Sequence, residues 1–251
     1  MISVITVCYN SEKTILETLH SVFDQKDVEI EHIIIDGMST DQTFEIVKTF
    51  VRDHQKTNLT YQLIQEKDQG MYDAINKGLN LFRGDYVGIL NSDDTYANNH
   101  VLKTIQSTFQ KDYIDAVYGY VDVYDGTNII RKIRNDVFQL GDYQKSKHPA
   151  HPTFYLKKDI IKKHGEYDLS YKIASDGEYI FRLLEIHQIK HALIKEVLVH
   201  MKDGGMSQRG LKSTLQIIKD TKHFMRKHKK RFSVLLYVFH KLRKIKEYRN
   251  E

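Results

Sequence analysis

Residues 84–95 read Gly-Asp-Tyr-Val-Gly-Ile-Leu-Asn-Ser-Asp-Asp-Thr. The first half of this stretch is an apolar run of strand length, rich in β-branched and aromatic residues, which favours a buried β-strand. The run ends in four polar residues, of which Asp93 and Asp94 are adjacent carboxylates. Open α/β sheets bind ligands at the carboxyl ends of their strands. The stretch therefore predicts two acids placed to hold a divalent cation or a ribose.

Three earlier stretches have the same strand pattern: residues 2–8 (ISVITVC), 32–36 (HIIID) and 60–65 (TYQLIQ). Between the strands, apolar residues recur at helical spacing, and Ser11 is expected to cap the first helix. Strands that alternate with amphipathic helices predict a parallel sheet with right-handed crossovers. The first 95 residues are therefore expected to form a Rossmann-like layered sandwich.

The second half is less regular. Residues 116–123 and 128–133 are predicted to be strands around a turn, which indicates a mixed sheet. Residues 136–152 hold both prolines and are expected to form a surface loop over the site. A helix is predicted over residues 176–187, and a last strand over residues 195–201.

Composition limits the possible classes of protein. The 251 residues are 41% apolar, which suits one substantial core. The single cysteine, Cys8, lies in an apolar run, so we expect a buried thiol, no disulfide framework and a reducing compartment. No run of about 20 apolar residues occurs, and the chain begins with a strand pattern rather than a signal peptide. These features predict a cytoplasmic protein without a membrane-spanning helix.

Several cofactor motifs are missing. The turn after the first strand, Tyr9-Asn10-Ser11, lacks the glycines that a dinucleotide fold needs, which disfavours NAD and FAD. There is no phosphate-binding Gly-x-x-x-x-Gly-Lys loop, and no Cys-x-x-Cys or His-Glu-x-x-His zinc signature. A bound nucleotide would therefore depend on acidic side chains and a cation.

Other polar residues are candidates for the site. Asp36 ends the second strand and is placed to accept hydrogen bonds from a base or ribose, whereas Asp41 is expected to cap the next helix. Asp176 opens a helix of the second half, where a carboxylate either caps the helix or faces a cleft, and the two roles are compatible. Glu178 is the alternative acid there. His151 and His200 are single histidines, which usually have structural roles.

Four segments in register closely resemble the family 2 glycosyltransferases with a GT-A fold. They are residues 4–10 (VITVCYN), 35–41 (IDGMSTD), 68–78 (DQGMYDAINKG) and 84–94 (GDYVGILNSDD). Their order, spacing and placement all match, and the resemblance covers residues 1 to about 207. It implies an α/β GT-A domain over residues 1–210, with a nucleotide-sugar-binding half at 1–95 and an acceptor-binding half at 96–210. Residues 211–251 are then a basic helical C-terminal extension.

The resemblance implies a role for each of several residues. Asp36 is similar to the acid that contacts the base, and Asp68 to a second nucleotide-side acid. Asn10 and Asp93 join this nucleotide-binding set, with Asp93 near the ribose. Asp94 is then the metal ligand.

The acceptor side has implied roles as well. His200 is a candidate to complete the metal site, and Asp176 takes the position of the catalytic base. The loop at 204–207 resembles the flexible loop that closes over the donor.

This chain departs from the family pattern at two places. The family often has Asp-Asp-Gly after the second strand, where this chain has Asp36-Gly37-Met38. The family also often has an acid where Asn91 stands, so metal binding is expected to depend on Asp93 and Asp94, with Asn91 outside the ligand set.

The resemblance implies an inverting, metal-dependent hexosyltransferase-type enzyme. Its donor would be a nucleotide-diphosphate sugar held with Mn²⁺ or Mg²⁺, and its acceptor a carbohydrate or lipid-linked hydroxyl in cell-surface polysaccharide or glycolipid synthesis. One alternative, a nucleotidyltransferase, would need a Gly-rich basic loop after the first strand, which is absent. The other is a catalytically inactive relative that acts as a membrane-associated assembly partner.

The charge is unevenly distributed. Residues 211–251 carry 13 Lys or Arg and three Asp or Glu, whereas residues 1–210 carry 25 basic and 30 acidic residues. This basic tail is expected either to pack on the body or to bind an anionic membrane surface, which would place the protein on the inner face of the cytoplasmic membrane. Nucleic acid is disfavoured because no reader motif is present.

Overall fold

The computed structural model describes the whole chain except residues 112, 146, 172, 205–209, 236–238 and 240–251. Its strands are β1 (Ile2–Cys8), β2 (Ile30–Asp36), β3 (Leu59–Gln65), β4 (Tyr86–Ile89), β5 (Thr95–Tyr96), β6 (Ala116–Tyr124), β7 (Ile129–Ile133), β8 (Tyr155–Lys157) and β9 (His191–Lys202). Its helices are α1 (Ile15–Phe23), α2 (Thr43–Asp53), α3 (Met71–Leu81), α4 (Val101–Lys111), α5 (Lys158–His164), α6 (Ser175–Phe181) and α7 (Gly210–Lys227). Short turns of helix are η1 (Asp142–Lys145), η2 (His151–Thr153) and the π-type η3 (Arg182–Ile186).

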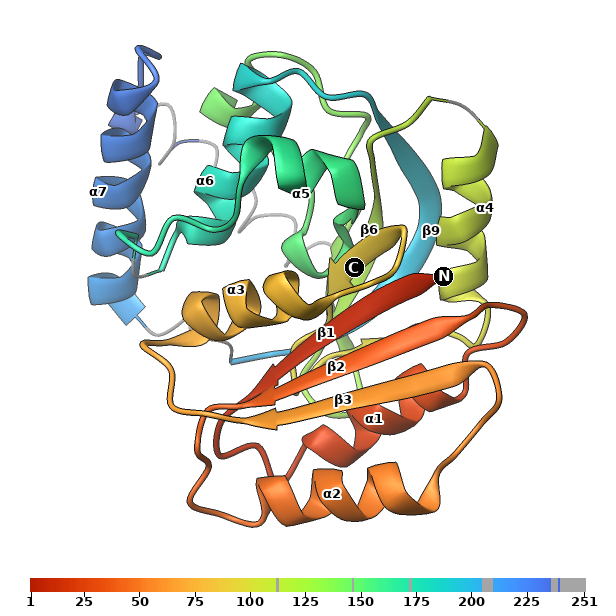
Figure 1. The fold of residues 1–251 in the computed structure, drawn as a ribbon. Coiled ribbons are helices and arrows are strands. Elements are labelled where there is room, and N and C mark those ends of the chain that lie inside the picture. The colour runs from red at the N-terminus through yellow and green to blue at the C-terminus, as the bar shows by residue number, and fades with distance from the viewer. Residues whose placement is uncertain (112, 146, 172, 205–209, 236–238, 240–251) are drawn as a thin grey trace.

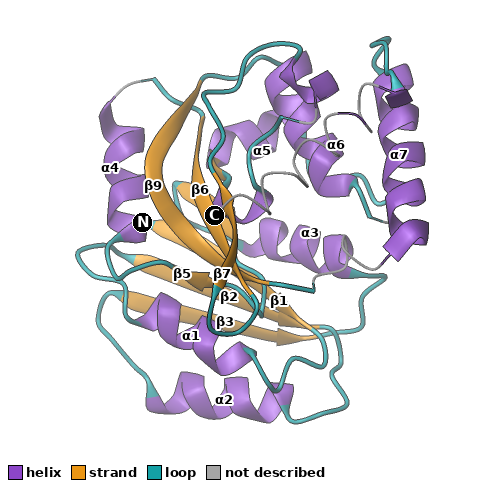
Figure 2. Ribbon diagram, turned by 180° about the vertical axis from the view of Figure 1, so that it is seen from behind, coloured by secondary structure: helices purple, strands orange, loops and turns teal. Residues whose placement is uncertain are grey.

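The described strands form one nine-stranded sheet in the order β3-β2-β1-β4-β8-β6-β9-β5, with β7 paired to β6 (Figures 1 and 2). The first half is parallel, as predicted, since β1 pairs with β2 and β4, and β2 pairs with β3. In this register Cys8 lies opposite Asp36, and Asp36 lies opposite Gln65. The three strands therefore end at the same edge of the sheet.

The second half makes the sheet mixed, as predicted. Strand β8 pairs antiparallel with β4 and β6, and β6 runs parallel to β9, beside which Figure 2 shows it. Two strands, β5 and β8, were not predicted from the sequence. They are two and three residues long, which is too short for an alternating pattern to be visible.

Helices cover both faces of the parallel half (Figure 1). Ile33 and Ile35 pack into the core cluster that contains the apolar residues of α3, whereas Ile34 packs with residues of α1 and α2. This division follows from the two-residue period of a strand, which directs successive side chains to opposite faces. An uninterrupted apolar strand is therefore buried on both sides.

The predicted cap of the first helix is wrong. Helix α1 begins at Ile15, and the Ser11 hydroxyl makes no capping bond. That hydroxyl lies 2.8 Å from the hydroxyl of Ser92. Ser11 therefore joins the loop after β1 to the loop after β4, and this contact between strand ends replaces the helix cap.

Helix α7 packs along α6 on the second half of the molecule (Figure 1). The fully buried Phe224 ring lies 5.2 Å from the ring of Phe181 and 5.7 Å from that of Tyr143. Lys227 adds an ion pair to Asp168 at 3.0 Å. Packing of the extension on the body, one of its two predicted modes, is therefore seen for α7. None of the described helices is long and apolar enough to cross a membrane.

Replacement of Phe224 by Ala should lower the free energy of unfolding by about 3–5 kcal/mol, because it leaves a cavity among buried aromatic rings. Urea unfolding followed by circular dichroism measures this loss. The matched control is Leu215→Ala on the same helix, where the side chain is 66% exposed, and its effect should stay within about 0.5 kcal/mol. Equal effects of the two substitutions would show that α7 does not share the core of the body.

Candidate active site

Asn10 and Asp36 lie at the carboxyl ends of β1 and β2, where their loops are bonded together. Asn10 has a left-handed backbone (φ 52°), which Asn tolerates. Its side-chain oxygen accepts a hydrogen bond from the Thr40 amide at 2.8 Å, and its backbone N–H donates to the Ser39 hydroxyl at 2.9 Å. The buried Asp36 carboxylate accepts from the Ser39 amide at 3.0 Å and from Gln65 at 3.1 Å. Asp36 thereby holds the loop that follows it.

Asp68 lies directly over Gly37. Its Oδ1 accepts from the Gly70 amide at 2.8 Å, and a Cβ on Gly37 would stand 2.3 Å from its Oδ2. A side chain at position 37 would therefore make the Asp68 carboxylate move aside. The glycine that replaces the second acid of the family pattern lets Asp68 lie close to the backbone of that loop.

Asp93 and Asp94 lie in a tight turn after β4. The Asp94 amide donates to the Asn91 carbonyl at 3.1 Å, and the Thr18 hydroxyl donates to the Asp94 carbonyl at 2.8 Å. The turn holds the Asp94 side chain at 1% exposure, whereas Asp93 is exposed.

The pKa values of both acids of this turn are raised, because the positive charge around them does not offset the loss of water. Burial, and then the charge of Asp93, raise the pKa of Asp94 to about 7, although the Asn91 amide donates to its Oδ2 at 2.9 Å. Asp93 is exposed as a residue, but the protein atoms around its carboxyl group remove part of its water and raise its pKa, against the opposing charge of Lys202. Additional positive charge would favour the ionised form of both carboxylates.

The residues present suit a hard divalent cation. The side-chain oxygen of Asn91 is buried and has no hydrogen-bond partner, and amide and carboxylate oxygens are the ligands that such ions prefer. In the part of the chain that the structure describes, no three His, Cys, Asp or Glu side chains gather closely enough to hold a metal ion. A cation here would therefore complete its coordination with oxygen atoms of a bound ligand and with water.

His200 has different neighbours from those expected. Its ring centroid lies 4.9 Å from that of Tyr124, and burial lowers its pKa against the opposing charge of Asp122. Among the described residues, no hydrogen bond or ion pair joins His200 to Asp94. Lys202 is the cationic residue whose charge lowers the pKa of Asp93, and its backbone has the same effect on Asp94. Sequence reasoning missed Lys202 because it ended the last strand at residue 201.

Asp176 lies in the first turn of α6 and is held by a residue of the first half. Its Oδ1 accepts from the Gly177 amide at 2.7 Å and lies 3.0 Å from the Tyr72 hydroxyl of α3. The N-cap position of α6 belongs to Ala174, which has no side-chain capping bond, so the Asp176 carboxylate binds an N–H of the first turn from within the helix. In the described structure Oδ2 has no hydrogen-bond partner, so this oxygen is available to accept a proton.

Glu178, the alternative acid, is engaged in an ion pair. Its side chain is 1% exposed, and its Oε1 lies 3.0 Å from Arg182 Nε and 3.6 Å from His228 Nε2. Arg182 also donates to the carbonyl of Glu166 at 2.6 Å. Glu178 therefore links α6 to α7 and the neighbouring loop, which leaves Asp176 as the acid of this helix that can act as a base.

His151 makes a hydrogen bond in the interior, as expected of a structural histidine, and the charge of Asp176 also acts on it. Its Nε2 lies 2.7 Å from the Tyr167 hydroxyl. Burial lowers the pKa of His151, and the charge of Asp176 opposes this effect. Tyr72 was missed altogether, because its spacing is that of an ordinary core position of α3.

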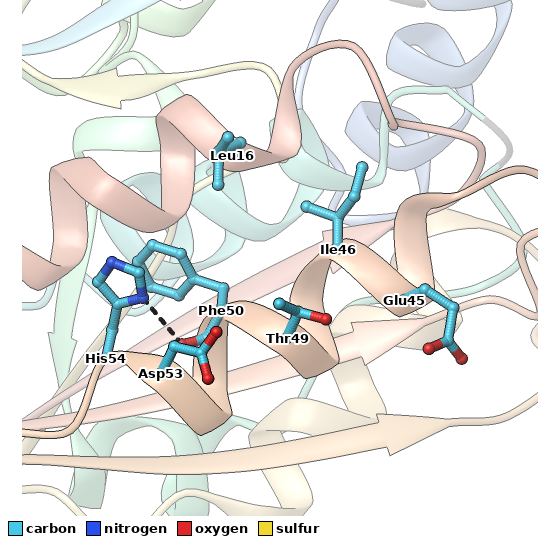
Figure 3. Close-up of a pocket in the computed structure, with 7 residues that line it drawn as sticks. All are labelled: Leu16, Glu45, Ile46, Thr49, Phe50, Asp53 and His54. Carbon is cyan, nitrogen blue, oxygen red and sulfur yellow. Dashed lines mark hydrogen bonds between the residues drawn. The ribbon is translucent and has the colours of Figure 1, made fainter.

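Two cavities lie outside these clusters. An apolar hollow of about 380 Å³ lies between α1 and α2 (Figure 3) and is lined by Leu16, Glu45, Ile46, Thr49, Phe50, Asp53 and His54. None of the predicted site residues lines it. A polar cavity of about 240 Å³ is lined by Arg134, Asn135, Asp136, Phe138, Asp142, Lys147, His148 and Pro149. The His148 ring of this second cavity lies 5.2 Å from Tyr143, whose hydroxyl abuts Gly177 beside Asp176.

Known structures share this fold. S. aureus TarS (residues 1–349), solved in complex with UDP-GlcNAc, superposes with a TM-score of 0.70 at 21% identity, covering 89% of this chain and 65% of that one. The mannosyltransferase PcManGT from Pyrobaculum calidifontis, solved with GDP-Man and Mn²⁺, gives a TM-score of 0.67 at 18% identity, with coverages of 90% and 63%. The predicted GT-A fold is confirmed.

Known sequences are also similar. The chain is 33% identical over 128 residues to the putative teichuronic acid biosynthesis glycosyltransferase TuaG of Bacillus subtilis. The aligned region covers 51% of this chain and 50% of that relative. The chain therefore spans about half the length of TuaG. It is 27% identical over 185 residues to a PGL/p-HBAD biosynthesis glycosyltransferase of Mycobacterium bovis, with coverages of 72% and 69%.

A model of one protein family matches most of the domain described above. The match, to the family described as Glycosyl transferase family 2, extends over residues 3–166. It begins in β1 and ends just after α5, so it contains the loops that carry Asn10, Asp36, Asp68, Asp93 and Asp94. Because the match spans well over half of the chain, this protein belongs to glycosyl transferase family 2.

Proposed function

We propose that this protein transfers a sugar from a nucleotide-diphosphate sugar to an acceptor hydroxyl. The observation that carries this proposal is that Asp93 and Asp94 lie together at the carboxyl edge of the parallel sheet and that both have raised pKa values, as acids do without a nearby compensating cation. The loops with Asn10, Asp36 and Asp68 lie at the same edge, as a nucleotide platform requires. Support also comes from the UDP-GlcNAc and GDP-Man complexes of proteins with this fold.

A divalent cation, Mn²⁺ or Mg²⁺, would be held by Asp94 with help from Asp93. Asn91, which the sequence pattern left outside the ligand set, would contribute its buried side-chain oxygen, which has no hydrogen-bond partner. When bound, the cation supplies Lewis-acid stabilisation of the negative charge that develops on the departing diphosphate. Lys202 adds a second positive charge beside the same acids. Asp36 and Asp68 hold the loops against which the nucleoside would lie. His200 stays a candidate ligand, because its backbone pairs with that of Thr95, the residue after Asp94.

Asp176 would act as the catalytic base. Its Oδ1 is occupied by two donors, so Oδ2 would remove the proton from the acceptor hydroxyl as that oxygen attacks the anomeric carbon. Attack and departure on opposite faces of the sugar in one displacement invert the configuration. The polar cavity is a suitable place for the acceptor, because its lining residue His148 stacks on Tyr143, whose hydroxyl lies against Gly177 next to Asp176.

The acceptor would belong to cell-surface polysaccharide or glycolipid synthesis, as the names of TuaG and of the mycobacterial relative suggest. The C-terminal segment would bind an anionic membrane surface. Arg226, Lys229 and Arg231 are exposed there, and the exposed Leu235 side chain follows them at 85% exposure. Cationic and apolar side chains in this order suit a bilayer interface. Most of the tail on which the sequence prediction depended, including residues 240–251, lies outside the described residues.

Asp94→Asn should stabilise the metal-free protein more at pH 8 than at pH 5. The folded pKa of Asp94, about 7, lies above its ordinary value of 3.8. The folded state therefore keeps its proton longer than the unfolded state, and wild-type stability falls as pH rises through this window. Asn carries no charge, so its advantage should grow by about 3 kcal/mol between the two pH values. Urea unfolding in EDTA measures it.

Two additions make this test specific. The exposed Asp24→Asn control should show no such dependence on pH. Added Mn²⁺ with UDP or GDP should raise the melting temperature of the wild type and leave that of Asp94→Asn unchanged. An equal rise in both proteins would argue against Asp94 as a cation ligand.

Asp176→Asn should abolish transfer while nucleotide binding persists. Loss of a general base lowers the rate by about 10²–10⁴-fold, because the amide cannot take the acceptor proton. A panel of nucleotide sugars, with and without Mn²⁺, first identifies the donor that the wild type uses; product formation then measures transfer. The exposed Asp159→Asn serves as control. Normal transfer by Asp176→Asn would refute the base assignment, and a wild type without any donor turnover would favour the inactive assembly partner.

Reversal of charge at Arg226, Lys229 and Arg231 to Glu should weaken binding to vesicles of phosphatidylglycerol and phosphatidylcholine by at least about 100-fold, since each basic side chain contributes about 1 kcal/mol at such a surface. Co-sedimentation measures the bound fraction. A variant with the same change of net charge at the exposed Lys13, Lys48 and Lys103 is the control. Equal losses in the two variants would mean that binding is not localised to the C-terminal segment.

A further inference from the structure

We propose that Tyr72 is a positioning residue for the base Asp176, and that its hydroxyl fixes the carboxylate in the orientation needed for proton removal. The inference rests on the proposed function, because it takes Asp176 as the base. It assigns a task to a residue that the sequence pattern places among ordinary core positions of α3.

The hydroxyl of Tyr72 reaches two oxygens at once. It lies 2.7 Å from the carbonyl of Ile173 and 3.0 Å from Oδ1 of Asp176. A phenol has one proton, so the two acceptors share it. One side chain of the first half thereby holds both the backbone that leads into α6 and the carboxylate that α6 carries.

These contacts divide the Asp176 carboxylate into a fixed and a free oxygen. The Gly177 amide donates to the same Oδ1 at 2.7 Å. Two donors on one oxygen stop the carboxylate from rotating, which leaves Oδ2 aimed in one direction. A base held in this way needs little reorganisation when the acceptor arrives, and misplacement of such a group by about 1 Å can cost about 100-fold in rate.

The Tyr72 ring is itself held firmly. It stacks on Tyr167 with ring centroids 5.9 Å apart and planes 17° from parallel, and Tyr167 stacks on Tyr179 at 4.2 Å. Burial and the charge of Asp176 raise the pKa of Tyr72 well above its ordinary value, so the hydroxyl keeps its proton and remains a donor. The orientation of the base therefore depends on a rigid stack of aromatic rings.

The hydrogen bond of Tyr72 also connects the nucleotide-binding edge of the sheet to the base Asp176. Tyr72 lies four residues after Asp68, across a turn in which Gly70 has a φ of 123°. The Asp73 carboxylate closes this turn by accepting from the Gln69 amide at 2.9 Å. The segment that rests on Gly37 at the nucleotide edge is thus continuous with the residue that orients Asp176.

Tyr72→Phe tests the role of the hydroxyl because it keeps the ring and its packing. The matched control is Tyr179→Phe. Tyr179 is also buried and belongs to the same ring stack, but its hydroxyl has no hydrogen-bond partner in the described structure. If Tyr72 only filled the core, the two substitutions would have the same effect on transfer.

The experiment compares kcat and donor KM of the full-length wild type, Tyr72→Phe and Tyr179→Phe, with the nucleotide sugar that the wild type uses in the panel. We expect kcat of Tyr72→Phe to fall about 10- to 100-fold with donor KM within about twofold, and Tyr179→Phe to stay within about twofold in both. Melting temperatures show that each variant is folded. Tyr72→Phe combined with Asp176→Asn should be no slower than Asp176→Asn alone, since both remove one function.

The possible failures can be told apart. An active wild type with unchanged kcat in Tyr72→Phe overturns the positioning role and leaves the proposed function intact. Equal losses in Tyr72→Phe and Tyr179→Phe also overturn it, because they indicate a packing effect. A wild type that turns over no nucleotide sugar overturns the proposed function, and the role of Tyr72 with it.

Discussion

The parallel pairing of β1, β2 and β3 is the constraint on which the rest of the structure depends. Because Cys8, Asp36 and Gln65 are in register, the three strands end level with one another and the loops that follow them begin side by side. Hydrogen bonds then join the loops: the Thr40 amide donates to the Asn10 side chain, and the hydroxyls of Ser11 and Ser92 bond to each other. A shift of register by one residue would turn every side chain of a strand to the opposite face and would separate these partners.

This shared edge explains why polar groups can be buried there. Asp36 loses water but gains hydrogen bonds from Ser39 and Gln65, so its burial is compensated within the protein. Asp94 gains much less, and its raised pKa is the result. The contrast distinguishes an acid whose charge is compensated by hydrogen bonds within the protein from one whose charge is not. It is the clearest electrostatic feature of the first half.

The sequence predicted the elements of the first half well, since uninterrupted apolar strands, helical periodicity and strand-end acids are local signals. It was less informative wherever a residue acts through a distant partner. Tyr72 has the spacing of a core residue, and its bond to Asp176 spans 104 positions. Ser11 has the composition of a helix cap, yet its hydroxyl meets Ser92. The strands β5 and β8 depend on sheet neighbours rather than on any pattern of their own. The positions of Lys202 and His151 likewise follow from tertiary pairing.

The docking of α7 through Phe224 has an evolutionary consequence. Phe224 on the inner face of α7 packs against the rings of Phe181 in α6 and Tyr143. The residues of this inner face can therefore change only together with those of α6, the helix that carries Asp176. The outer face of α7 is free of this packing constraint, since Lys222 and Arg226 are exposed there. Selection can therefore adapt that face to a new surface or partner without disturbing the packing behind Asp176, and relatives in this family should diverge fastest there.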